Sequence, residues 1–344
     1  MKIGIIGLPE SGKTTIFEVL THNVIDTGHK EETRIGTIKV PDKRVDVLSN
    51  MYKPKKTIYA QVAYFLPGFQ GHGKEPTKEY NIWNEVRDCD ALIHVVRNFG
   101  GYGFKNPDPY SDFFSFDQEM ILADLVVVEK RLERIELEKQ RHRKIDQEES
   151  DLLTECRKKL ENGIPLRKNP DFAFAPALKG FAFVSAKPML VLFNNEDDDD
   201  SLPEMKNVIS MESCMIVKGK LEQELAHMSD EEAEEFLSEF NITASAMDRV
   251  ITRSYELQGL ISFFTVGEDE VRAWTIKKGT QALDAAGIIH TDIKKGFIRA
   301  EVVSYGDLIN AGTHHEARKK GNVRLEGKTY EVQDGDIINF RFNV

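Results

Sequence analysis

A glycine-rich segment near the N-terminus contains residue types that could bind a phosphate group. Gly7, Gly12, Lys13 and Thr14 fall at the spacing GxxxxGK(S/T), the pattern of a loop whose backbone N–H groups surround phosphate oxygens. Lys13 can reach the β- and γ-phosphates as a catalytic cation, and the hydroxyl of Thr14 can bind Mg²⁺. We predict that a nucleotide contacts Gly7, Pro9, Glu10, Ser11, Gly12, Lys13, Thr14 and Thr15.

The elements on either side of this segment must position it. Residues 3–6 are apolar, which is typical of a buried parallel strand, and Ile16, Val19 and Leu20 recur at helical spacing. The start of the helix adds its partial positive charge to the phosphate site. A strand, a glycine-rich loop and a helix in this order predict an α/β nucleotide-binding domain.

A later strand, expected over residues 58–65, leads to Gly68, where a nucleotide switch has the sequence DxxG. In that motif the glycine N–H contacts the γ-phosphate and the Asp binds Mg²⁺ through water. Gly68 is therefore the second candidate for a catalytic contact, but Phe65 occupies the Asp position. A phenyl ring cannot hold the water shell of a cation, so we expect weakened Mg²⁺ binding. Thr27 and Thr33 both remain candidates for the threonine that completes the Mg²⁺ shell.

The base of the nucleotide should be read after the strand expected over residues 187–193. Asn194 and Asp197 fit an N-x-x-D turn, in which Asn positions the loop and Asp accepts hydrogen bonds from guanine. The lysine of the usual N-K-x-D turn is replaced by Asn195. Lys220 lies where a second base-contacting loop is expected, and we include it among the nucleotide-binding residues.

Composition limits the class of protein. The chain has 344 residues and a net charge of −11, which argues against nucleic-acid binding over the whole surface but leaves room for a local basic patch. It lacks an apolar stretch of about 18 residues, and Met1-Lys2 leads directly into the first strand, so we expect a cytoplasmic protein without a leader peptide. Candidates for a basic patch are Lys277, Lys278, Lys294, Lys295 and Arg299.

The middle of the chain, from Asp117 to about Glu161, is helical and highly charged. Its first half has apolar residues at alternating steps of four and three, the seam of a coiled coil, and a second apolar set follows Ser150. We predict two antiparallel helices that form a projecting hairpin, closed by Asn162-Gly163. The two apolar sets are Ile121, Leu125, Val128, Leu132 and Ile135, then Leu152, Leu153, Cys156 and Leu160.

Beyond Leu260 the sequence closely resembles the C-terminal TGS domain of the YchF subfamily of Obg-like ATPases. The resemblance rests on residues 260–265, 271–280, 285–292, 295–302 and 332–336, and it extends upstream through residues 121–125, 129–132 and 220–225 to the P-loop. It implies an α/β fold: a Ras-like P-loop NTPase domain, a helical insertion and a β-grasp TGS domain. The expected boundaries are 1–117 and 181–258 for the nucleotide domain, 118–180 for the helical insertion and 259–344 for the TGS domain.

The resemblance also implies a function. The family prefers ATP over GTP, a preference attributed to an N-x-x-E turn, and has a hydrophobic residue in place of a catalytic Gln. Phe69 looks like that hydrophobic residue, whereas Asp197 stands in place of the Glu, and the family's S-A-K loop appears as Lys218-Gly219-Lys220. The ribosome, or its ribosomal RNA, is the implied macromolecular partner, through the TGS and helical domains.

Three functions therefore remain open. The first is a slow ATPase or GTPase, expected as a monomer, that associates with the ribosome as a translation or stress-related regulator. The second is a nucleotide-bound adaptor that does not hydrolyse its ligand and docks on the ribosome or RNA. The third is docking alone, without nucleotide chemistry. Phe65 favours the second function over the first, and the intact P-loop around Lys13 argues against the third.

Overall fold

The computed structural model describes residues 1–22, 33–68, 82–101, 105–173, 175–205, 212–229, 231–232, 235–236 and 245–343. Contacts along the chain divide it into two compact units. The first unit comprises Met1–Ile38 and Ala63–Val250, and the second comprises Lys39–Val62 and Ile251–Val344.

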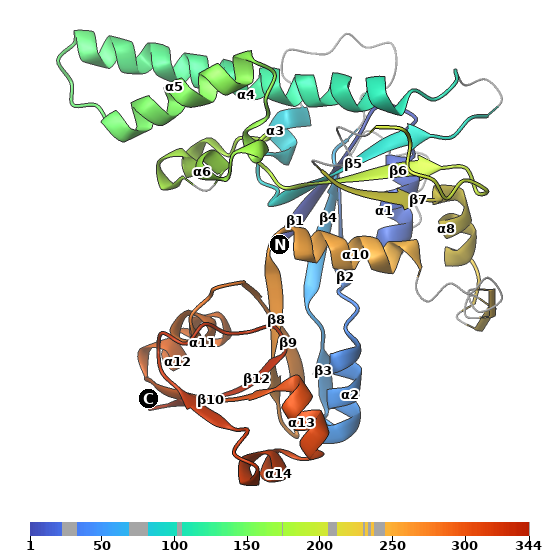
Figure 1. Cartoon of the computed structure of the whole chain (residues 1–344), viewed down its shortest axis with the longest axis vertical. Coiled ribbons are helices and arrows are strands. Elements are labelled where there is room, and N and C mark those ends of the chain that lie inside the picture. Colours follow the sequence, from blue (N-terminus) through green and yellow to red (C-terminus); the bar gives the residue numbers. More distant parts are fainter. Residues whose placement is uncertain are drawn as a thin grey trace. The chain divides into compact units, whose positions relative to one another are not determined.

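The first unit is built on a sheet in which the described strands follow the order β2-β4-β1-β5-β6-β7 (Figure 1). The central strand β1 pairs in parallel with β4 and β5, and β5, β6 and β7 continue the parallel arrangement. Every residue of β6 is buried, as expected for a parallel strand covered on both faces. The strands are β1 (Lys2–Ile6), β2 (Arg34–Lys39), β4 (Gln61–Leu66), β5 (Ala91–Asn98), β6 (Met189–Asn195) and β7 (Ser213–Val217).

Helices and 3-10 turns complete the described part of the first unit. Its main core cluster packs aromatic and aliphatic side chains such as Trp83, Phe116 and Phe193 against the sheet. The described helices are α1 (Lys13–Thr21), α3 (Ile82–Val86), α4 (Pro109–Gln140), α5 (Gln147–Glu161), α6 (Pro170–Ala173), α8 (Gly219–Ala226) and α10 (Ala246–Leu257), whose last turns belong to the second unit; the 3-10 turns are η2 (Leu166–Lys168) and η3 (Pro176–Phe181).

The predicted pair of antiparallel helices is present as α4 and α5 (Figure 1). A separate apolar cluster holds the two helices together, and it includes Ile121, Val128 and Ile135 from the predicted seam and Leu153 from α5. Helix α4 begins earlier than expected, because Asp108 caps its N-terminus by accepting a hydrogen bond from the Ser111 N–H at 3.0 Å and a proline occupies its first position.

The second unit has its own sheet, in the order β11-β10-β12-β8-β9-β3. Antiparallel pairs join β8 to β9 and β10 to both β11 and β12, whereas β12–β8 and β3–β9 are parallel. The strands are β3 (Lys56–Ile58), β8 (Leu260–Val266), β9 (Glu270–Lys277), β10 (Phe297–Ser304), β11 (Arg324–Glu326) and β12 (Asp336–Phe342), and the helices are α2 (Lys43–Tyr52), α11 (Ala282–Ile289), α12 (Thr291–Lys295), α13 (Tyr305–Ala311) and α14 (His314–Lys319).

The segment Lys39–Val62 differs from the expected domain plan. We placed residues 1–117 in the nucleotide domain, but this segment forms contacts with the C-terminal part of the chain. Strand β3 pairs in parallel with β9, matching Thr57 to Val271. The difference arises because a pairing between such distant residues leaves no mark in the local sequence pattern.

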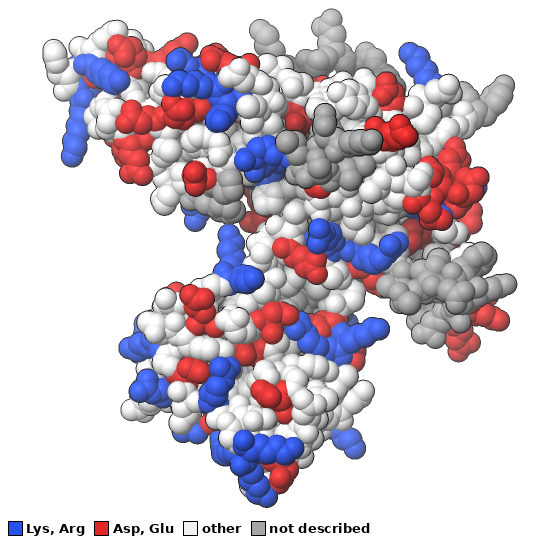
Figure 2. Space-filling model, viewed as in Figure 1, with Lys and Arg blue, Asp and Glu red and all other residues white. Residues whose placement is uncertain are grey.

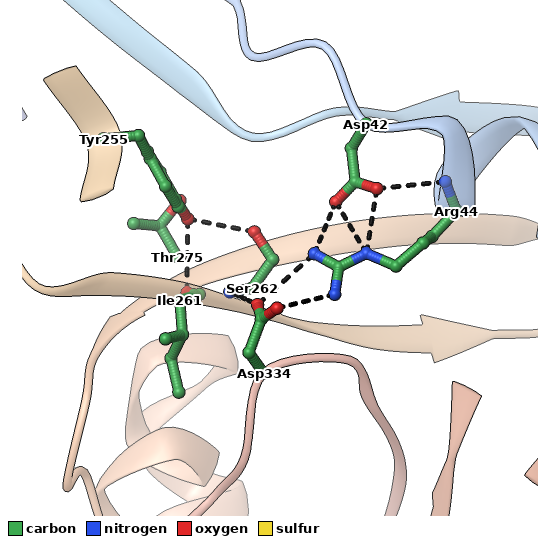
Figure 3. Close-up of polar contacts among 7 residues, drawn as sticks. All are labelled: Asp42, Arg44, Tyr255, Ile261, Ser262, Thr275 and Asp334. Atoms are coloured by element: carbon green, nitrogen blue, oxygen red, sulfur yellow. Dashed lines mark hydrogen bonds and ion pairs between the residues drawn. The ribbon is translucent and has the colours of Figure 1, made fainter. Parts of the chain in front are cut away.

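A polar network ties α2 to the rest of the second unit (Figure 3). Arg44 donates to Asp334 at 2.7 Å and to Asp42 at 2.9 Å, and its guanidinium lies 5.1 Å from the ring of Phe264. Asp334 also accepts a hydrogen bond from the Ser262 N–H at 2.9 Å. The carboxylate of Asp334 thereby joins α2 to β8.

No helix in the described part of the chain is long and apolar enough to span a membrane.

Candidate nucleotide-binding site

The P-loop follows β1 and ends at α1, as predicted. Gly12 caps α1 with a left-handed backbone (φ +89°), and a Cβ atom there would overlap the side-chain amide of Asn194. At Gly7 a Cβ atom would approach the backbone oxygen of Val95 to 2.5 Å. Both glycines are therefore required by close approach, and Gly12 also by its backbone angle.

Lys13 lies in the first turn of α1, and its ammonium donates to the Leu8 carbonyl at 3.0 Å. Burial lowers the pKa of Lys13 to about 8, because the charged form loses hydration. A phosphate placed beside this ammonium would restore the stabilisation of its charge. Thr14, the predicted metal ligand, follows in the same turn and is half-buried.

Asn194, at the end of β6, joins three segments of the site. Its Nδ2 donates to the Ser11 carbonyl at 3.1 Å, and its Oδ1 accepts the Gly219 N–H at 2.9 Å. The side chain is buried among these partners. The predicted base-reading turn is thus bonded to the P-loop on one side and to the start of α8 on the other.

A cavity of about 380 Å³ opens beside this junction, within the size range of small-ligand sites. Of the predicted residues, Gly12, Thr15, Asn194, Asp197 and Lys220 line it. Asp197 and Lys220 face each other in an ion pair of 3.8 Å, and both are well exposed to solvent.

Several residues that line this cavity are not among those predicted from the sequence. Phe99 and Gly100 follow β5, and Glu196 lies between Asn194 and Asp197. The Gly100 N–H donates to the Glu196 carboxylate at 2.6 Å, which joins the two loops. A signal was available, because the carboxyl ends of neighbouring parallel strands meet at one edge of a sheet, and a glycine-rich segment follows β5 there.

The other predicted residues do not line the cavity, and they include Gly7, Ser11, Lys13 and Thr14 of the P-loop. Pro9 and Glu10 are exposed within the P-loop, and Glu10 has a left-handed backbone (φ +64°). Gly68 is buried just after β4, and Thr33 is exposed just before β2. The remaining predicted positions, Phe69 and Thr27, fall outside the described residues.

Phe65 is a core residue of β4. It is 6% exposed, pairs with Gly4 of β1, and packs in the main core cluster, and the Lys2 ammonium lies 4.0 Å from its ring centre. Among the described residues no group of three or more His, Cys, Asp or Glu side chains could hold a metal ion. The donor set thus fits Mg²⁺ only in part, since Thr14 offers a hydroxyl but Phe65 offers no oxygen.

His94 on β5 is a buried titratable side chain of this unit. Its ring stacks on Phe116 and Phe113, with centroid distances of 4.8 and 5.5 Å. Burial, followed by the nearby charge of Arg167, lowers the pKa of His94 to about 3. The imidazole is therefore neutral at physiological pH and serves in packing.

Comparison with known proteins places this geometry in a family. The family model YchF-GTPase_C, described as "Protein of unknown function (DUF933)", matches residues 260–343. The chain is 36% identical to "Ribosome-binding ATPase YchF" of Bacillus subtilis (strain 168), covering 99% of both chains, and 34% identical to the Haemophilus influenzae protein of the same name, covering 100% of this chain and 99% of that one.

Solved structures with a similar fold include a member of the same family. The "YchF GTPase" of Schizosaccharomyces pombe superposes with a TM-score of 0.82 at 28% identity, covering 99% of this chain and 97% of that one. A "GTP binding protein" from Pyrococcus horikoshii OT3 gives a TM-score of 0.61 at 19% identity over the full length of both chains, which supports the fold alone. With this similarity over nearly its whole length, the chain belongs to the YchF family.

Proposed function

We propose that this protein binds ATP or GTP in the cavity beside Asn194, hydrolyses it slowly at most, and associates with the ribosome. The observation that carries the nucleotide proposal is the double hydrogen bond of Asn194 to Ser11 and Gly219. It sets the P-loop and the base-reading turn at a fixed separation beside a cavity large enough for a nucleoside. Association with the ribosome is proposed because the relatives from Bacillus subtilis and Haemophilus influenzae are named ribosome-binding ATPases.

The roles of the residues follow from their positions. Backbone N–H groups of the P-loop, with Lys13, would neutralise the phosphates, and the Gly68 N–H would contact the γ-phosphate. The base would lie against Asn194, with Asp197 and Lys220 at its edge. Mg²⁺, when bound, would add positive charge at the phosphates, with Thr14 as its ligand from this chain.

Calorimetric titration tests the site. The protein is titrated with ATP and with GTP, each with and without Mg²⁺, and the same titrations are repeated with Lys13→Ala. Binding that Lys13→Ala abolishes supports the assignment, and tighter binding of GTP assigns base recognition to Asp197. Absence of binding by either nucleotide refutes the nucleotide proposal, whatever the protein does at the ribosome.

A second candidate is a nucleotide-bound adaptor that does not hydrolyse its ligand. Phe65 favours it, because a buried aromatic side chain occupies the position at which switch proteins hold the water shell of Mg²⁺. Single-turnover measurements separate the two candidates: release of phosphate from bound ATP or GTP supports slow hydrolysis, and intact nucleotide after prolonged incubation supports the adaptor.

The remaining parts of the proposal concern the whole chain. We propose a cytoplasmic monomer with the TGS domain at residues 259–344 and the helical insertion at 118–180, both directed to the ribosome. Co-sedimentation of the purified protein with ribosomes, with and without nucleotide, tests this association. Protein that stays in the supernatant under every nucleotide condition refutes it.

A further inference from the structure

The turn between α4 and α5 carries a cluster of basic side chains that the nucleotide site does not use. We call it the basic tip, and it consists of Lys139, Arg141, His142, Arg143 and Lys144. All five side chains are exposed, and the stretch 139–144 contains no acidic residue. The first unit as a whole is acidic, with 27 Lys and Arg against 42 Asp and Glu.

The charges of the basic tip are not neutralised by neighbours. Within the part of the chain that the structure describes, none of its five side chains forms an ion pair or a side-chain hydrogen bond. The adjacent acidic groups are engaged elsewhere: Glu138 pairs with Arg131 at 3.4 Å, and the Asp146 carboxylate accepts the Glu149 N–H at 3.2 Å as the cap of α5. Some other cations of the helical pair do have partners, such as Arg131 with Glu149 at 2.7 Å and Lys158 with Glu155 at 2.6 Å.

Compensation of a helix dipole accounts for only part of the cluster. Cations in the last turn of a helix stabilise its C-terminus, and this role suits Lys139 and Arg141 at the end of α4. Arg143 and Lys144 lie beyond that turn, where the effect of the dipole has fallen off. The helix dipole therefore does not account for Arg143 and Lys144.

The backbone of the tip is ordered by hydrogen bonds. His142 has a left-handed backbone (φ +53°), the Arg143 N–H donates to the Glu138 carbonyl at 2.9 Å, and the His142 N–H donates to the Lys139 carbonyl at 3.0 Å. These two bonds and the left-handed residue form a Schellman motif, which ends α4 sharply. The side chains are therefore presented on a preorganised turn, which lowers the entropic cost of binding.

The helical pair holds this turn away from the sheet. Asp124 of α4 is fully buried and accepts the Ser185 N–H at 2.7 Å, which anchors the helix to the body of the unit. From Asp124 to Gln140 the helix extends roughly 24 Å at 1.5 Å per residue. In Figure 1 the turn lies at the outer end of the pair, and in Figure 2 blue side chains lie at this end while red and blue alternate along the arm.

We propose that the basic tip binds the phosphate backbone of ribosomal RNA. This inference rests on the proposed association with the ribosome, for which the basic tip would be a contact surface. Guanidinium groups bind phosphate oxygens through two parallel hydrogen bonds, and Arg141 and Arg143 supply two of them on one turn. Contacts of this kind position a protein without reading sequence. An acidic protein surface is the competing partner, and the experiment separates the two.

The test compares two triple variants that lose the same charge. Arg141→Gln/Arg143→Gln/Lys144→Gln removes the tip, and Lys130→Gln/Arg134→Gln/Lys158→Gln removes three exposed cations from the sides of the same two helices. Binding to intact ribosomes and to deproteinised ribosomal RNA is measured over a series of KCl concentrations. We expect the tip variant to bind both at least about tenfold more weakly, with a salt slope smaller by about two to three, and the control to bind like the wild type.

The outcomes are distinguishable. Equal affinity and equal salt slope for the tip variant and the wild type would overturn the proposal, as would an equal loss in the control. Binding to ribosomes but not to naked RNA, lost in the tip variant, would overturn RNA in favour of an acidic protein surface. Wild-type binding to RNA that requires the tip, without binding to ribosomes, would refute the proposed ribosome association and support RNA recognition by the tip.

Discussion

Asn194 is the residue on which the geometry of the nucleotide site depends. Its amide satisfies one carbonyl of the P-loop and one N–H of the β7–α8 turn, so that a single side chain sets the distance between them. The predicted phosphate contacts of the P-loop, including Lys13 and Thr14, lie within one loop and take their positions from their neighbours in sequence.

Replacing Asn194 by alanine should weaken nucleotide binding about tenfold or more. The buried Gly219 N–H would lose its acceptor, at a cost of about 1–3 kcal/mol, and the P-loop would lose its link to the base site. Calorimetric titration with ATP and GTP measures the loss. Asn98→Ala is the matched control. The side chain of Asn98, on β5, donates to the side chain of Asn195 on β6 at 2.9 Å, and Asn98 does not line the cavity. An equal loss in both variants would contradict the role given to Asn194.

The lowered pKa of Lys13 predicts a pH dependence of binding. In the free protein Lys13 loses its proton above pH 8, whereas a bound phosphate raises its pKa towards the ordinary value of a lysine. Binding therefore takes up a proton in this range, and nucleotide affinity should fall about tenfold per pH unit above pH 8. Titrations at a series of pH values measure the trend, and proton uptake in buffers of different ionisation enthalpy confirms its origin. A constant affinity up to pH 10 would contradict the prediction.

At the scale of elements, buried ion pairs join the helical arm to the sheet. Arg167 lies in the 3-10 turn η2. Its guanidinium donates to Asp117 of α4 at 2.7 Å and lies 2.9 Å from the carboxylate of Glu212, just before β7. All three side chains are less than a tenth exposed. The base of the arm is thus fixed by charges that solvent does not reach.

Arg167→Met should lower the free energy of unfolding by about 3–5 kcal/mol, because it leaves the Asp117 carboxylate buried without its cation. Glu212 is less affected, since Lys168 also contacts it at 2.6 Å. Denaturant unfolding followed by circular dichroism measures the change. The double variant Asp117→Asn/Arg167→Met should recover part of the loss, and a single variant as stable as the wild type would show that the pair contributes little.

At the scale of the whole molecule, the structure divides the chain differently from the order of its sequence. Lys39–Val62 leaves the first unit after β2, adds α2 and β3 to the second unit, and returns through β4. Leu48 on α2 is fully buried, and Leu190 on β6 is an equally buried leucine of the first unit.

These two leucines give a matched test of the division. Leu48→Ala should destabilise the second unit by about 2–5 kcal/mol and increase hydrogen exchange in β8, β9 and β12. Leu190→Ala should instead increase exchange in β1, β5 and β6. Mass spectrometry of exchanged peptides follows both. Faster exchange in β5 than in β8 on replacing Leu48 would assign α2 to the first unit and contradict the division.

Much of the site could be predicted from the sequence, because its parts are local. The P-loop is a run of nine residues. Its glycines are needed for their backbone angles and its lysine for the length of its side chain, and both properties depend on residues nearby in the sequence. The substitution at Phe65 is readable from spacing alone. The helical arm is equally visible, since its apolar seam repeats along the chain at a helical period.

Only the tertiary structure decided which distant segments meet. Lys55 and Asp269, 214 positions apart, form an ion pair at 2.7 Å where β3 joins β9, and no local pattern marks that pairing. Phe99, Gly100 and Glu196 line the candidate nucleotide site because parallel strands end at one edge of the sheet. The basic run at 139–144 was present in the sequence, but its lack of acidic partners depends on where Glu138 and Asp146 are held. Backbone angles and helical period are properties of a few successive residues, whereas pairing across a sheet is set by the packing of the whole unit.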